Sequence, residues 1–261
     1  MKARKFFTLI LIGMISHSSL FGQREGNSLV NASVDSIPKK QGAKTTEIIG
    51  IALPAAMITY GAISLGNNGI RQVDYNVHNS LEQNNRLWHT HVEDYLQFSP
   101  AAAAYVMKFC KVESTHNLLD MTILYGLSNV LAGGIVQGTK MITGRERPDN
   151  SNNNSFPSGH TETAFVAAEF LHQEFKDKSV WISVGGYTVA TFVGVARIYN
   201  NKHWLSDVIT GAGVGILSTK AVYWIYPYLQ KAFEKNGHAL QTFICPGYSD
   251  GNFNLSLSCT F

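Results

Sequence analysis

The sequence has little charge. Of its 261 residues, 15% are charged, and the formal net charge is +3, so nucleic-acid binding has no compositional support. No internal repeat is visible, and the only biased block is an asparagine-rich run near residue 152. Although charge is sparse, a mean hydropathy of −0.02 is low for a chain that crosses a membrane many times.

Cysteine is also scarce, and the three residues make an odd number. Cys110 is expected to pack within a helix. Cys245 and Cys259 flank the turn residues Asp250-Gly251, so outside the cytoplasm they either form a disulfide or remain two free thiols.

A metal centre lacks support from residue spacing. His89 and His91 lie two apart but have no carboxylate or cysteine partner at a metal-binding spacing. We therefore expect an amphipathic surface at this position, with no metal site and no cofactor.

The N-terminus is typical of an export signal. Lys2, Arg4 and Lys5 precede a short apolar run from Phe6 to Ile15. Residues 1–22 are therefore predicted to be a signal peptide cleaved after Gly22, with an uncleaved anchor as the alternative. Residues 23–46 are polar and predict a linker, which in both cases begins outside the cytoplasm.

The remaining apolar runs predict an all-α fold. Ile48–Leu65 lacks charge and is long enough to span a bilayer, with a kink at Pro54. Further helices are expected over residues 100–110, 118–141, 161–175, 180–199 and 204–228. The sequence thus predicts a helical bundle of about six core helices over residues 47–230. A tail follows at 231–261, with a short C-terminal β-hairpin.

Three basic or histidine-bearing clusters lie at expected helix ends or in loops. They are Lys140 to Arg147-Pro148, then Pro157-Ser158-Gly159-His160, and then Arg197 through His203 to Asp207. Lysine and arginine side chains suit phosphate oxygens as fixed positive donors. Pro-Ser-Gly-His before an apolar run is typical of a helix N-terminus, where free N–H groups attract an anion.

The third cluster also suggests a nucleophile. His203 and Asp207 are four apart, which places them on one face of a helix. A carboxylate that holds one imidazole nitrogen leaves the other free as a base or nucleophile. Any one cluster alone is more often a surface or capping feature, but together they predict phosphoryl transfer through a phosphohistidine.

The pattern Lys-x6-Arg-Pro, Pro-Ser-Gly-His and Arg-x5-His-x3-Asp, in this order, resembles the type-2 phosphatidic acid phosphatase and vanadium haloperoxidase superfamily. That family's third motif usually opens Ser-Arg, whereas this chain has Ala196-Arg197. The difference removes only a peripheral hydroxyl.

The resemblance implies a phosphate-binding set. Lys140, Arg147 and Arg197 are expected to hold the non-bridging phosphate oxygens, and Ser158 and the Gly159 amide are expected to add donors. Positive charge around these oxygens stabilises the transition state without a metal ion.

The resemblance also implies three catalytic residues. His203 is expected to attack phosphorus and Asp207 to orient it. His160 is expected to protonate the leaving oxygen and then to activate water.

The compact chain argues against the haloperoxidase branch, so we expect a metal-independent phosphatase acting on a phosphate monoester of an envelope lipid. Similar phosphatases act on phosphatidate, isoprenyl phosphates or lipid A, and the lipid A 4′-phosphatase subgroup is favoured. One alternative is a soluble periplasmic acid phosphatase of broad specificity. Another is a non-catalytic envelope protein that binds anionic head groups.

Topology sets the expected location. Spans at 48–65 and 118–141 would place Lys140 outside the cytoplasm, whereas a third span at 100–110 would not. Glu169 and Lys220 within later helices favour a soluble periplasmic bundle, and the uncharged run at 48–65 favours a membrane protein. We expect inner-membrane association with a periplasm-facing site.

Overall fold

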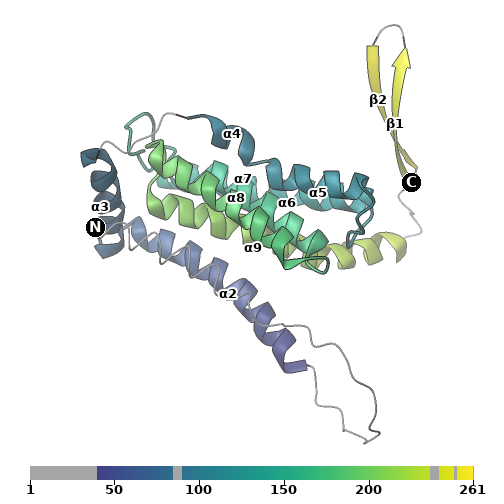
Figure 1. The fold of residues 1–261 in the computed structure, drawn as a ribbon, viewed down its shortest axis with the longest axis horizontal. Helices are drawn as coiled ribbons and strands as arrows, with labels where there is room; N and C mark the ends of the chain where they lie inside the picture. Colours follow the sequence, from purple (N-terminus) through teal and green to yellow (C-terminus); the bar gives the residue numbers. More distant parts are fainter. Residues whose placement is uncertain (1–39, 85–89, 236–240, 250–251, 261) are drawn as a thin grey trace, which may run out of the picture. The chain divides into compact units, whose positions relative to one another are not determined.

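The computed structural model describes residues 40–84, 90–235, 241–249 and 252–260 (Figure 1). The expected signal peptide and most of the expected linker lie outside these residues. The helices within them are α2 (Lys40–Ser64), α3 (Gly69–Gln83), α4 (Val92–Leu96), α5 (Ser99–Phe109), α6 (Leu118–Thr143), α7 (Gly159–Phe175), α8 (Val180–Tyr199) and α9 (Leu205–Lys235). The all-α class is confirmed for this helical part of the chain.

Helix limits follow local capping signals. Asn117 begins α6, because its side chain accepts the N–H of Asp120. Gly144 ends this helix in the left-handed region, with φ 52°, and donates its N–H to the carbonyl of Lys140. The limits of α8 agree with the sequence prediction. In contrast, α2 begins at Lys40, within the stretch expected to be a linker.

Two antiparallel strands follow the helices, β1 (Gln241–Ser249) and β2 (Asn252–Thr260). These strands do not establish the C-terminal β-hairpin that the sequence predicts, so the hairpin stays a prediction. In this register Cys245 lies opposite Ser256 and Cys259 lies opposite Thr242.

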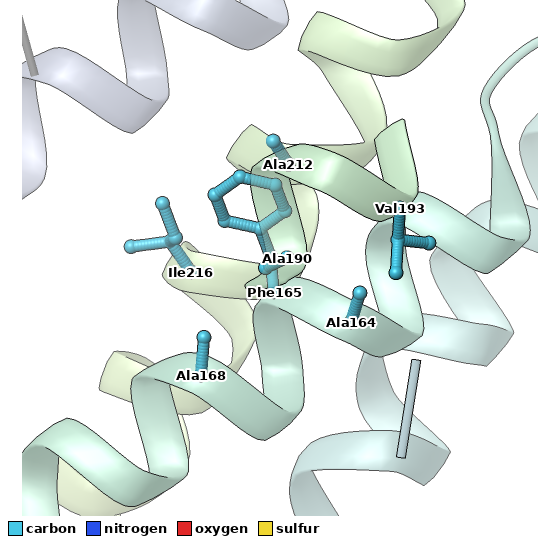
Figure 2. Packing of buried hydrophobic residues seen from close by; sticks show 7 residues of the cluster. All are labelled: Ala164, Phe165, Ala168, Ala190, Val193, Ala212 and Ile216. Carbon is cyan, nitrogen blue, oxygen red and sulfur yellow. The ribbon is translucent and has the colours of Figure 1, made fainter. Parts of the chain in front are cut away.

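The chain divides into two compact units between Thr219 and Lys220, within α9. In the first unit α7 is the central helix, and it packs against α5, α6 and α8. Its apolar side chains are almost all buried, as expected for a helix enclosed on several sides. Figure 2 shows one core cluster, formed by Ala164, Phe165, Ala168, Ala190, Val193, Ala212 and Ile216.

Among the described residues, three helices are long and apolar enough to cross a membrane, namely α6, α8 and residues 205–231 of α9. The expected span at 48–65 counts only together with α3, from which it is bent by 87°. One face of α6 is apolar and uncovered, with Val130 75% exposed and Ile135 44% exposed. Uncovered apolar faces of this kind suit contact with lipid.

Small residues let α9 approach α7 closely. A Cβ atom on Gly211 would lie 2.5 Å from the carbonyl oxygen of Ser158, and one on Gly215 would lie 2.6 Å from that of Glu162. Both separations are too short for a real side chain. Glycine at these two positions therefore fixes the distance between the helices that carry the second and third motifs.

Gly215→Ala is expected to lower the free energy of unfolding by about 1–3 kcal/mol, since the added methyl group forces α9 away from α7. The matched control is Gly126→Ala in α6, where no atom lies within 4 Å of the new Cβ. Thermal unfolding of both variants in detergent tests this, and equal melting temperatures would contradict the close approach.

Candidate active site

The three motifs meet at one end of the helical unit. Lys140 lies in the last turn of α6 and Arg197 in the last turn of α8, while Ser158 and Asp207 lie at the starts of α7 and α9. The Ser158 N–H donates to the Asp207 carbonyl at 3.0 Å, which joins the starts of these two helices. The chain thus brings its predicted site residues to a common end.

His203 is buried, with 2% of its surface exposed. Its Nδ1 lies 2.8 Å from the backbone carbonyl of Ser155. Because a carbonyl oxygen only accepts, Nδ1 carries the proton and Nε2 keeps its lone pair. Burial lowers the pKa of His203 to about 4, so the ring is neutral near neutral pH.

Asp207 supports His203 less directly than the sequence predicted. Since α9 begins at Leu205, His203 precedes the helix and the two residues do not share a helical face. The Asp207 Oδ2 lies 3.7 Å from Nδ1 of His203, farther than the Ser155 carbonyl. The same oxygen accepts the Ser155 hydroxyl at 2.5 Å and the Trp204 N–H at 2.9 Å. Asp207 therefore reaches His203 mainly through Ser155.

Three cations gather beside His203. Burial lowers the pKa of Arg147, and the positive charge of Arg197 lowers it further. The Nε atoms of Arg147 and Arg197 are buried and have no hydrogen-bond partner among the described residues, and the same holds for Nε of Arg145. Lys140 donates to the Asn154 carbonyl at 2.6 Å. Unpaired buried guanidinium donors fit the oxygens of a phosphate.

The start of α7 adds backbone donors on the same side. Ser158 is the N-cap in extended conformation and Gly159 is the first helical residue. The Ser158 hydroxyl accepts from Thr161 at 2.9 Å and does not cap the helix. A helix start with uncapped N–H groups favours an anion.

Two carboxylates from α4 were missed by the sequence analysis. Asp94 Oδ1 lies 2.8 Å from His160 Nε2, and Glu93 Oε1 lies 3.0 Å from Arg197 Nη1. Burial and the charge of Arg197 lower the pKa of His160, while Asp94 opposes them. Burial would raise the pKa of Asp94, but His160 and its other partners lower it overall. The sequence around Glu93 and Asp94 showed only an amphipathic stretch and did not indicate contacts with His160 or Arg197.

Arg145 and Asp74 were also missed. Arg145 donates to Asp207 at 2.8 Å and to Asp74 at 2.7 Å, and all three side chains are buried. Ser206 donates its N–H to Asp74 at 2.9 Å. This network anchors α3 to the start of α9. Arg145 lies between the first motif's signature residues, but Asp74 carries no sequence signal.

No group of three or more histidine, cysteine, aspartate or glutamate side chains is placed to hold a metal ion in the part of the chain that was searched. His89 lies outside the described residues. His91, its expected neighbour on an amphipathic surface, is exposed and lies 3.3 Å from Asp94.

Comparisons with known proteins agree with the motifs. Residues 121–231 match the sequence model of the PAP2 superfamily. The chain is 44% identical to the lipid A 1-phosphatase of Porphyromonas gingivalis over 139 residues, which are 53% of this chain and 31% of that protein. It is 33% identical to the lipid A 4′-phosphatase of the same organism over 73 residues, 28% of this chain and 30% of that protein.

The chain thus spans about a third of the length of these curated relatives. A solved structure, the transmembrane PAP2-type phosphatidylglycerolphosphate phosphatase of Bacillus subtilis, aligns with a TM-score of 0.47 at 18% identity. That alignment covers 68% of this chain and 97% of the solved one.

Acidification is expected to destabilise the protein through His203. Folded His203 has a pKa of about 4, against 6.5 in the unfolded chain, so in this window only the unfolded state binds the proton. Stability therefore falls as pH falls from 6.5 to 4, by up to about 3 kcal/mol from this group. Melting temperatures of wild type and His203→Gln over this range measure the effect.

The pH profile of the wild type must be compared with that of His203→Gln because Glu162 also titrates in this pH range. Burial raises its pKa to about 7 from 4.5, so its contribution to stability falls as pH rises through that window, opposite in sign to His203. Glu162 is present in both proteins, so the difference between their pH profiles isolates His203. Parallel profiles would show that His203 is not held neutral by burial.

Proposed function

Residues 121–231 of the chain are a PAP2 superfamily domain, and from this premise we propose that the protein is a lipid phosphatase that works through a phosphohistidine. One observation carries the proposal. His203 presents an unprotonated Nε2, and Arg147 and Arg197, at the same end of the bundle, each keep a buried Nε without a hydrogen-bond partner among the described residues. A neutral imidazole beside a cluster of cations suits attack on a phosphate.

In the first step, the lone pair of His203 Nε2 forms a bond to phosphorus. The bond between phosphorus and the lipid oxygen breaks, and His160 gives its proton to that oxygen. Lys140, Arg147 and Arg197 hold the equatorial oxygens, where negative charge is concentrated. These three cations supply the neutralisation that a metal ion supplies elsewhere.

In the second step, water attacks the phosphohistidine. His160, now neutral, takes a proton from the water as the new oxygen–phosphorus bond forms. The phosphorus–nitrogen bond breaks, inorganic phosphate leaves, and His203 returns to its starting state. Ser155 keeps its carbonyl on Nδ1, so Nε2 is again the free nitrogen.

A lipid substrate is supported by two observations. The similar Porphyromonas gingivalis proteins are lipid A phosphatases by name, and the greater identity is to the 1-phosphatase rather than to the favoured 4′-phosphatase. Helix α6 carries both an uncovered apolar face and, in its last turn, Lys140, so the expected lipid contact and phosphate binding lie on one helix. We infer inner-membrane association with the site facing the periplasm.

His203→Ala is expected to abolish phosphate release, because the attacking atom is lost. Wild type quenched during turnover of a radiolabelled lipid phosphate should carry acid-labile phosphate, and His203→Ala should not. His172→Ala, at the far end of α7, is the matched control and should keep both properties. Near-normal turnover by His203→Ala would disprove the assignment.

Asp94→Asn is expected to slow hydrolysis of alkyl phosphates, such as lipids, by roughly tenfold to a hundredfold. Without the carboxylate, His160 loses the partner that favours its protonated form. An aryl phosphate with a good leaving group needs no such acid and should be affected little. Glu113→Gln, an exposed carboxylate paired with Lys178, is the control. Equal loss on both substrates would mean that Asp94 does not act through His160.

A further inference from the structure

Asp74 in α3 is a buried carboxylate that the proposed mechanism does not use. Its Oδ2 accepts hydrogen bonds from Arg145 Nη2 at 2.7 Å and from the Ser206 hydroxyl at 2.5 Å. Its Oδ1 accepts the Ser206 N–H at 2.9 Å. All three bonds lead toward Asp207, because Ser206 precedes it in the chain and Arg145 pairs with it.

The guanidinium of Arg145 is divided between two buried carboxylates. Nη1 donates to Asp207 Oδ1 at 2.8 Å, whereas Nη2 donates to Asp74 Oδ2. A guanidinium paired with one carboxylate commonly donates to both of its oxygens through two parallel bonds. Because Asp74 occupies Nη2, Arg145 does not pair with Asp207 in this way. The Oδ2 atom of Asp207 therefore remains available to other donors.

The atom that this division leaves available is the one that positions Ser155. Asp207 Oδ2 accepts the Ser155 hydroxyl at 2.5 Å, and the Ser155 carbonyl lies 2.8 Å from His203 Nδ1. If Arg145 donated to both oxygens of Asp207, its Nη2 would compete with Ser155 for Oδ2. Ser155 would then lose the bond that holds it, and its carbonyl would no longer keep the proton of His203 on Nδ1.

Asp74 lies apart from the predicted phosphate contacts. None of the hydrogen bonds or ion pairs found for Asp74 among the described residues involves Lys140, Arg147 or Arg197. Helix α3 also ends before residues 121–231, the segment that matches the PAP2 model. Loss of Asp74 should therefore affect the attacking group more than the binding of the phosphate.

We propose that Asp74 is a positioning residue for the nucleophile, which holds Nη2 of Arg145 away from Asp207 so that Ser155 can orient His203. The inference deepens the phosphatase function proposed above and rests on it. Asp74 touches neither the substrate nor the reacting atoms, and it acts through Arg145 and Asp207.

The first test is Asp74→Asn, which keeps the size of the side chain and removes its charge. It is expected to lower kcat roughly tenfold to a hundredfold and to leave KM within about twofold. The loss should be the same on phosphatidate and on para-nitrophenyl phosphate, because both esters need His203 to attack, and this separates Asp74 from Asp94. Glu82→Gln, an exposed carboxylate on the same helix, is the matched control and should change neither constant. A loss confined to KM would overturn the proposal.

A double-mutant cycle tests whether Asp74 acts through Ser155. Asp74→Asn and Ser155→Ala should each lower kcat, and the double variant should stay within about twofold of the slower single variant, because both changes remove the same hydrogen bond. Two losses that multiply would show that Asp74 acts by another route, and the proposal would be wrong.

Nitrogen NMR of histidine-labelled protein tests the proposal without any activity. The resonances of His203 are identified by their loss in His203→Gln. Wild type should show the proton on Nδ1, and Asp74→Asn should show a mixture of the two neutral forms. An unchanged spectrum in Asp74→Asn would overturn the positioning role.

Melting temperatures report whether each variant folds. If Asp74→Asn does not fold, Ser206→Ala replaces it, since this change removes one of the donors that hold Asp74 and should give a smaller loss of kcat with KM again unchanged. If wild type releases phosphate from neither ester, the proposed function fails, and the NMR comparison still decides whether Asp74 fixes the proton of His203.

Discussion

The buried carboxylate of Asp207 is the group on which the rest of the site depends. It accepts hydrogen bonds from Arg145, from the Ser155 hydroxyl and from the N–H of Trp204. A buried charge is stable only when it is paired and hydrogen-bonded, so these three donors are held where Asp207 requires them. Ser155, positioned by this bond, presents its carbonyl to His203 and fixes which nitrogen carries the proton.

Arg145 and Arg147 are two residues apart in one loop, but Arg145 pairs with carboxylates inside the protein, whereas Arg147 is predicted to bind phosphate. Both Nη atoms of Arg145 are paired with buried carboxylates, of Asp207 and Asp74, and its guanidinium lies over Trp204. Its charge is therefore neutralised inside the protein. The Nε atoms of both arginines are buried without a hydrogen-bond partner among the described residues, but only for Arg147 do burial and the positive charge of Arg197 lower the pKa. Positive charge therefore remains at Arg147, where an anion is proposed to bind.

The sequence predicted those features of the fold that neighbouring residues in the chain determine. The apolar run of α8 and the turn signal of Pro-Ser-Gly-His both predicted helix ends close to those observed. The sequence did not predict contacts that depend on how separate helices pack together. Asp94 meets His160 because α4 packs on α7 and α8, which no local pattern records. The spacing of His203 and Asp207 was misread for a related reason, since α9 begins only after His203.

The site combines residues from two parts of the chain with different contributions. Every residue predicted to touch the phosphate lies within residues 121–231. The carboxylate that contacts His160 comes from α4, and Asp74, which pairs with Arg145, comes from α3; both helices precede that segment. The predicted phosphate contacts thus belong to the first part of the site, whereas the partners of His160 and Arg145 belong to the second. Under the proposed mechanism, changes in α4 can therefore alter which ester is cleaved without altering the predicted nucleophile.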